Sequence, residues 1–247
     1  MRLFTAFGDA FEQYASDILA RMYPRSPVLV DRLMRNIKGC DARGREFEID
    51  ASLLDVSQTV FFEMKAAFLR EEAITNPNPD VLLGEIRAKY GAGNSPKQRD
   101  KGVAQLARSI GAVMRGEWLG DHNIFSDINV VYPVLVVHDM RLDAPALGHF
   151  LENDFRSLLG PIPDGKHVRP LTVMTIQDLE NLEASVDAFS FVDLLSDYSR
   201  ECPDRMRSLH NFIVFSSYGA KILPGPSLIE ASTGIITALL QELFPKE

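Results

Sequence analysis

At 247 residues with 46% hydrophobic content, the chain can bury a full core, as one large domain or as a domain with an extension. No apolar run approaches the roughly 20 residues of a membrane-spanning helix, and Asp9 and Glu12 stand where a signal peptide would be apolar, so we expect a cytoplasmic protein with no membrane partner. Cys40 and Cys202 are isolated from each other and from any histidine pair, which argues against a disulfide framework or a zinc cluster.

The net charge of −8 is unevenly distributed along the chain. Residues 176–204 contain eight acidic residues and one basic residue, which leaves the rest nearly neutral. Residues 21–45 hold seven basic and two acidic residues, and residues 97–108 hold four basic and one acidic. Such locally positive segments can hold a phosphate backbone despite the acidic total, although isolated arginines are equally typical of a solvated surface.

The first expected element is a helix over residues 4–22, which Pro24 ends. Apolar residues recur at helical spacing to form its buried stripe: Phe7, Phe11, Tyr14, Ile18 and Met22. Glu12 borders this stripe, where a carboxylate is either solvated or directed toward a site. Residues 27–38 predict the first strand, and residues 39–44 predict a turn.

Residues 47–65, FEIDASLLDVSQTVFFEMK, read as two strands joined by a turn at residues 54–58. Residues 59–62 are β-branched and aromatic, which suits a strand covered on both sides. Side chains alternate along a strand, so the expected faces are Phe47, Ile49 and Ala51 opposite Glu48, Asp50 and Ser52, and Val60, Phe62 and Met64 opposite Phe61, Glu63 and Lys65.

A hairpin of these strands would bring Asp50 and Glu63 together on one face, with Lys65 beside them. Two neighbouring carboxylates repel unless a cation lies between them, and a hard divalent ion such as Mg²⁺ is held by such a sparse set. An adjacent lysine could orient or deprotonate the attacking water, or offset charge on a phosphate. The combination favours metal-dependent cleavage of a phosphodiester, and the simpler alternative is a structural ion pair between Glu63 and Lys65.

Loop signals follow, around a short helix at residues 81–89, and then a longer helix over residues 97–117. The core-facing residues of the longer helix are Val103, Leu106, Ile110 and Val113, and its neighbouring stripe is Lys97, Lys101, Gln105 and Arg108. Three cations on one stripe suit an anionic partner, although a solvated face would show the same pattern.

Residues 129–138 predict an apolar strand, in which Pro133 indicates an edge position or a bulge. His138 at its end is more typical of a structural histidine than of a ligand. The remaining chain predicts a strand within residues 167–175 and helices over residues 144–159, 176–183, 189–200, 204–218 and 227–243.

Asp50 followed by Glu63-Met64-Lys65 resembles the D…(D/E)xK signature of the PD-(D/E)XK, or restriction-endonuclease-like, nuclease superfamily. The resemblance covers roughly residues 5–140, and the expected order of helix, three strands, helix and strand agrees with it independently of the tripeptide. It implies an α/β fold with an αβββαβ core, in which helices flank a central mixed sheet. We expect this nuclease-like domain to span residues 1–175, with residues 176–247 as an acidic helical extension.

The resemblance also implies the roles of individual residues. The catalytic residues would be Asp50, Glu63, Lys65 and Gln105, and the ligands of Mg²⁺, or of Mn²⁺ in its place, would be Asp50, Glu63, the Met64 carbonyl and Glu12. Lys97, Lys101 and Arg108 would contact the nucleic acid.

The expected activity is hydrolysis of nucleic acid, DNA rather than RNA, in a defence or repair system. A homodimer would suit cleavage of both strands, and the acidic helices could pack on the core or dock onto a protein partner. The alternative is a catalytically inert module of the same fold that serves assembly or nucleic-acid binding.

Overall fold

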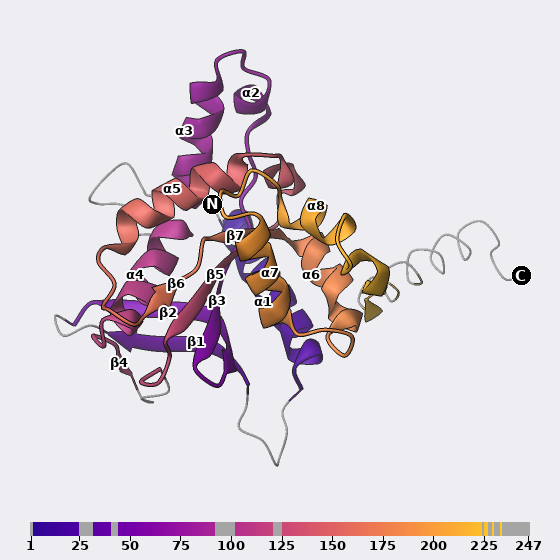
Figure 1. Ribbon diagram of the computed structural model, residues 1–247. Helices are drawn as coiled ribbons and strands as arrows, with labels where there is room; N and C mark the ends of the chain where they lie inside the picture. The colour runs from indigo at the N-terminus through magenta and orange to yellow at the C-terminus, as the bar shows by residue number, and fades with distance from the viewer. Residues whose placement is uncertain are drawn as a thin grey trace, which may run out of the picture.

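The computed structural model describes residues 2–24, 32–40, 44–91, 102–120 and 125–223, together with residues 225, 226, 229 and 233. A mixed β-sheet lies at the centre, with helices packed on both of its faces (Figure 1). The sequence-based expectation of a mixed α/β fold with flanking helices is therefore confirmed.

The sheet has the strand order β4-β1-β2-β3-β5-β6, and β7 also pairs with β5. Its strands are β1 (Leu33–Cys40), β2 (Glu46–Asp55), β3 (Gln58–Lys65), β4 (Leu119–Gly120), β5 (Val130–Val137), β6 (His167–Val168) and β7 (Thr172–Thr175). The pairs β1–β2, β2–β3 and β1–β4 are antiparallel, whereas β5 runs parallel to β3, β6 and β7. The parallel pair at the centre requires the long connection from β3 to β5, whose described residues include helices at 71–74, 79–90 and 103–114.

The helices are α1 (Arg2–Met22), α2 (Glu71–Ile74), α3 (Pro79–Tyr90), α4 (Val103–Met114), α5 (Leu147–Leu159), α6 (Ile176–Leu182), α7 (Phe191–Glu201) and α8 (Leu209–Val214). Short 3-10 turns occur at η1 (Met140–Asp143), η2 (Glu183–Ser185) and η3 (Gly219–Lys221). Among the described residues, no helix combines the length and the apolar character that crossing a bilayer would need.

Two apolar clusters divide the core between the faces of the sheet. Helices α1, α6, α7 and α8 cover one face together with Val60, Phe62 and Met64 of β3, and helices α3, α4 and α5 cover the other face together with Phe61 (Figure 1). The alternation expected along β3 is thus confirmed. The acidic helices also share a core with the sheet, since the rings of Phe62 and Phe191 stack with their centroids 5.8 Å apart. The boundary after residue 175 stays a prediction.

Several expected boundaries need correction. The turn between β2 and β3 contains only Val56 and Ser57, with Val56 at φ +53°, rather than residues 54–58. Strand β1 continues through Cys40, so the expected turn does not begin at residue 39. In residues 204–218 the helix α8 covers only six residues. The expected segments 27–31, 41–43 and 97–101, and nearly all of 227–243, lie outside the described residues.

Pro133 does not mark an edge strand, because β5 lies between β3 and the strands β6 and β7. The N–H groups of His167 and Arg169 donate to the carbonyls of Asn129 and Val131, so the odd-numbered residues of β5 direct their backbone toward β6 and β7. Pro133 follows in this series and lies at the interruption between these two short strands. A proline is tolerated inside the sheet here because no ladder bond is lost at the interruption.

The expected alternation along β2 fails at Asp50. Ile49 packs in the cluster beneath α4, whereas Ala51 and Leu53 pack in the cluster beneath α1. On the neighbouring strand β1, Asn36 lies between the residues paired with Ile49 and Ala51 and has φ +51°, a conformation that asparagine tolerates better than most residues. Both strands are therefore distorted where Asp50 lies.

Candidate active site

Asp50 and Glu63 face each other across the strands β2 and β3. The last regular pair of this ladder is Ala51 with Phe62, and one more step of the same register places Asp50 opposite Glu63. One residue further, the side chain of Asp50 takes the place of the Ile49 backbone as the partner of Met64, because its Oδ2 accepts a hydrogen bond of 2.7 Å from the Met64 N–H. The strands separate at this point, and the two carboxyl groups lie where they separate.

Glu63 is almost completely buried, with 2% of its surface exposed. Its Oε1 accepts a hydrogen bond of 3.2 Å from the Gly102 N–H, which immediately precedes α4. Gly102 has φ +53°, and a Cβ atom at this position would lie 2.5 Å from the carbonyl oxygen of Tyr90. Only glycine fits here without strain, and it lets the positive end of the α4 dipole approach the Glu63 carboxyl group.

Burial and mutual repulsion make both carboxyl groups weak acids. Burial raises the pKa of Asp50 to about 7, the hydrogen bond from Met64 opposes this shift, and the charge of Glu12 reinforces it. Burial, and then the charge of Asp50, raise the pKa of Glu63 well above its ordinary value. The pair therefore gains from a shared proton or from a cation, because two bare charges are poorly tolerated at this depth.

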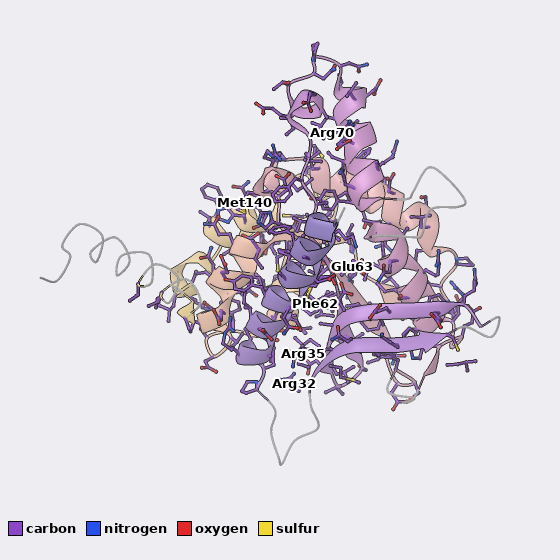
Figure 2. The ribbon with its side chains drawn as sticks, turned by 180° about the vertical axis from the view of Figure 1, so that it is seen from behind. Arg32, Arg35, Phe62, Glu63, Arg70 and Met140 are labelled. Carbon is purple, nitrogen blue, oxygen red and sulfur yellow. The ribbon has the colours of Figure 1, made fainter. Side chains whose placement is uncertain are left out.

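Lys65 brings a positive charge to this cluster. It is half-buried at the end of β3, and its charge lowers the pKa of Asp50, of Glu63 and of Glu12. Lys65 therefore lies close enough to both carboxyl groups to influence their charge, as the sequence indicated. Figure 2 shows Glu63 between helix α1 and the β1–β2 hairpin.

Glu12 belongs to the same electrostatic cluster from helix α1. Burial raises its pKa, Lys65 opposes this shift, and its own charge raises the pKa of Asp50 and of Glu63. The described part of the chain contains no group of three histidine, cysteine, aspartate or glutamate side chains arranged to hold a metal. Glu12 is therefore a neighbour of the Asp50–Glu63 pair. The groups that could ligate a cation between the strands are the carboxyl groups of Asp50 and Glu63 and a backbone carbonyl.

These donors suit a hard divalent cation. The described residues donate to Oδ2 of Asp50 and to Oε1 of Glu63, which leaves the second oxygen of each carboxylate for a cation. Because the Met64 N–H points toward Asp50, the Met64 carbonyl points to the same side of its strand, into the gap between β2 and β3. Two carboxylate oxygens and a carbonyl oxygen, with positions left for water, are a donor set that Mg²⁺ accepts.

Gln105 does not join this cluster through any hydrogen bond among the described residues. It lies half-buried on α4 against β2, and its Nε2 donates to the Glu48 carbonyl at 3.4 Å. Arg108 lies on the same helix and is also half-buried. Lys97 and Lys101 lie outside the described residues.

Sequence reasoning missed two residues that support the site, Gly102 and Tyr90. The expected helix over residues 97–117 has Gly102 in its interior, whereas in the structure Gly102 is the N-cap residue of α4, a position at which glycine is accepted. Tyr90 donates its hydroxyl hydrogen to the carbonyl of Ala67, two residues beyond Lys65, and its own carbonyl lies beside Gly102. No local pattern in the sequence announces this contact, because its partners come together only in the folded chain.

Neither a comparison with protein-family models nor one with the sequences of curated proteins gives a match.

Proposed function

We propose that this protein is a Mg²⁺-dependent nuclease that hydrolyses phosphodiester bonds, with DNA as the substrate. The observation that carries the proposal is the pair of Asp50, which is half-buried, and Glu63, which is buried, placed opposite each other where β2 and β3 separate, with Lys65 beside them. A protein that needs these residues only for stability gains little from burying two like charges together.

We propose a task for each residue of this cluster. Asp50 and Glu63, with the Met64 carbonyl, would hold the cation, and Glu12 would add negative charge at its edge. When bound, Mg²⁺ would polarise the phosphate and lower the pKa of a bound water. Lys65 would orient the attacking water or offset the charge that develops on the phosphate.

The order of elements supports the same proposal. Helix α1, strands β1, β2 and β3, helix α4 and strand β5 follow the αβββαβ order of the restriction-endonuclease-like nucleases, which the sequence resembles at Asp50 and at Glu63-Met64-Lys65. In this structure the central β3 runs parallel to β5, and both carboxyl groups lie on the central hairpin. Fold and motif are separate observations, and the proposal uses both.

A digestion panel tests the proposal directly. Plasmid DNA and single- and double-stranded oligonucleotides of DNA and RNA are incubated with Mg²⁺, Mn²⁺ or a chelator. We expect hydrolysis by the wild-type protein with either metal, none with chelator, and a loss of at least about 100-fold in Asp50→Ala and Lys65→Ala. Asp55→Ala is the matched control, because Asp55 lies at the other end of β2, where it pairs with Arg32 at 2.7 Å.

Hydrolysis that persists unchanged in Asp50→Ala and Lys65→Ala would come from a contaminant and would count against the proposal. If no polymer is cut with either metal, the protein is better described as a catalytically inert module of this fold, used for assembly or for binding nucleic acid.

A further inference from the structure

An aromatic cluster adjoins the carboxylate pair and has no task in the proposed chemistry. Phe68 lies three residues beyond Lys65 and is 43% exposed. Its ring packs against Phe7 of α1, with the centroids 5.2 Å apart, and against His138 beyond β5, at 4.8 Å. Phe11 supports the same histidine from α1 at 5.7 Å. One side of the Phe68 ring is thus fixed by other rings while much of its surface faces solvent.

The segments that carry Phe68 and His138 are held together by a buried carboxylate. Oδ2 of Asp139 accepts a hydrogen bond of 3.0 Å from the Leu69 N–H and forms an ion pair with Arg141 at 2.6 Å. Arg141 in turn donates to the Leu69 carbonyl at 3.1 Å. The backbone next to Phe68 is therefore fixed before any ligand arrives, so that binding at this ring would cost little conformational entropy.

The cluster is continuous with the proposed active site. The His138 N–H donates to the Lys65 carbonyl at 3.4 Å, and Phe11 is adjacent to Glu12 on helix α1. Figure 2 labels Arg70 and Met140, which follow the two segments, in the part of the molecule where α1 begins, toward the projection formed by α2 and α3. Nδ1 of His138 is buried without a hydrogen-bond partner among the described residues, and the ring packs against those of Phe7, Phe11 and Phe68.

We infer that Phe68, supported by Phe7 and His138, is a stacking platform for the base of an unpaired nucleotide beside the phosphodiester that is cleaved. An exposed, fixed aromatic ring stacks on any base, and stacking of this kind characterises proteins that bind single strands. Inside a duplex both faces of each base are covered by its neighbours, so the platform selects single strands, frayed ends or flaps. This inference rests on the proposed nuclease function and narrows its substrate class.

Binding measurements without turnover test the platform. The full-length protein is titrated, with Ca²⁺ in place of Mg²⁺, into single-stranded and blunt duplex DNA oligonucleotides of the same sequence, with fluorescence anisotropy as the readout. We expect tighter binding of the single strand, and an affinity about tenfold lower for it in Phe68→Ala, while Phe68→Trp retains the affinity. Phe215→Ala is the matched control, because Phe215 is 77% exposed and lies beyond α8, and it should bind like the wild type.

Phe68→Leu separates stacking from simple apolar contact and protects against a folding defect in Phe68→Ala. Leucine keeps the apolar volume but has no ring, so we expect it to bind as weakly as alanine. A 2-aminopurine base in the single strand adds a second readout, because stacking quenches its fluorescence, and we expect quenching with the wild-type protein and with Phe68→Trp only. Equal affinity and equal quenching in wild type, Phe68→Ala and Phe68→Leu would overturn the platform.

The two proposals fail in distinguishable ways. If Phe68 controls single-strand binding but no metal supports hydrolysis, the platform stands and the nuclease proposal falls. If Mg²⁺-dependent hydrolysis occurs while the preference for single strands is absent or independent of Phe68, the nuclease proposal stands and the platform is wrong.

Discussion

Asp50 combines two tasks that pull its charge in opposite directions. Its Oδ2 replaces a strand partner for the Met64 N–H, and this bond favours the ionised form, yet burial and the charge of Glu12 favour the neutral form. The balance leaves its pKa near 7, so a small change in the surroundings decides whether the group is charged. A bound cation would be such a change, which makes the occupancy of the site and the ionisation of Asp50 interdependent.

The raised pKa predicts how Asp50→Asn changes stability. An ordinary aspartate has a pKa of 3.8, and that of Asp50 is about 7 in the folded chain, so the folded state holds the proton more tightly. The stability contributed by the neutral form is fully present below the unfolded pKa and is lost as the pH rises through about 7. Asparagine keeps the acceptor for Met64 without the charge, so without metal we expect the variant to be more stable at pH 8, by on the order of 2–4 kcal/mol, with little difference near pH 4.

Urea unfolding of both proteins in the presence of a chelator measures this difference. Because the charge of Asp50 also raises the pKa of Glu63, the variant should additionally relieve repulsion on Glu63. A stability loss of the same size at both pH values would show that Asp50 is not held in a site that disfavours its charge.

At the scale of elements, helices α3 and α4 brace the end of β3. The Tyr90 hydroxyl at the end of α3 donates to the Ala67 carbonyl, while the Gly102 N–H at the start of α4 donates to Glu63. Tyr90 is completely buried, and its carbonyl lies where a side chain on Gly102 would have to be. The two helices thus set the positions of both Glu63 and the segment that follows Lys65.

Tyr90 is therefore a positioning residue, which Tyr90→Phe tests against Tyr132→Phe. Tyr132 is also buried, but its hydroxyl donates to Gln58 at 3.1 Å, at the opposite end of β3. Each variant loses one hydrogen bond, so we expect both to lose about 1 kcal/mol of stability. Only Tyr90→Phe should reduce kcat, by about tenfold and with little change in KM, because it alone loosens the segment after Lys65. Equal kinetics in the two variants would reduce Tyr90 to a structural role.

Element types and their order could be predicted from the sequence because hydrophobic periodicity reports them directly. The stripe from Phe7 to Met22 predicted α1, although Tyr14, an expected member of its buried face, is 38% exposed. The alternation of residues 60–65 predicted the faces of β3. The same alternation indicated that Asp50 and Glu63 would meet, because a hairpin leaves little freedom in its register.

What the sequence did not reveal depends on partners distant along the chain. Pro133 argued for an edge strand or a bulge, and the break between β6 and β7 explains its interior position. The distortion at Asp50 involves Asn36 on another strand, and Gln105 donates a hydrogen bond to the Glu48 carbonyl on β2. The local amino-acid sequence predicts none of these contacts, because each joins residues that are far apart along the chain.

At the scale of the whole molecule, the acidic C-terminal helices are fastened to the rest by specific polar contacts. Tyr14 of α1 donates to Glu180 at 2.6 Å, and Arg21 pairs with Glu183 at 2.5 Å. Arg205 is 1% exposed and donates to the carbonyls of Leu171 and Cys202, at 2.9 and 2.7 Å. It therefore joins the segment before β7 to the end of α7. Burial lowers the pKa of Arg205, because the charged guanidinium is removed from water.

We expect Arg205→Met to destabilise the protein far more than the loss of a surface charge does. Methionine approximates the side-chain volume but leaves several buried carbonyl groups without a donor, so the free energy of unfolding should fall by on the order of 3–5 kcal/mol. Arg200→Met is the control, because Arg200 is 67% exposed where it pairs with Asp197, and its loss should cost less than about 1 kcal/mol. Urea unfolding monitored by circular dichroism measures both, and similar losses would mean that Arg205 is not a fastening point.

The short turn at Val56 and Ser57 has a consequence for how this protein can change over evolutionary time. Strands β2 and β3 share one continuous register from this turn to the carboxyl pair. Exchanging either turn residue leaves this register intact, whereas adding or deleting one residue would shift the pairing by one and move every side chain of the shifted strand to the opposite face of the sheet. Related sequences should therefore show substitutions at these two turn positions but no insertions or deletions between β2 and β3.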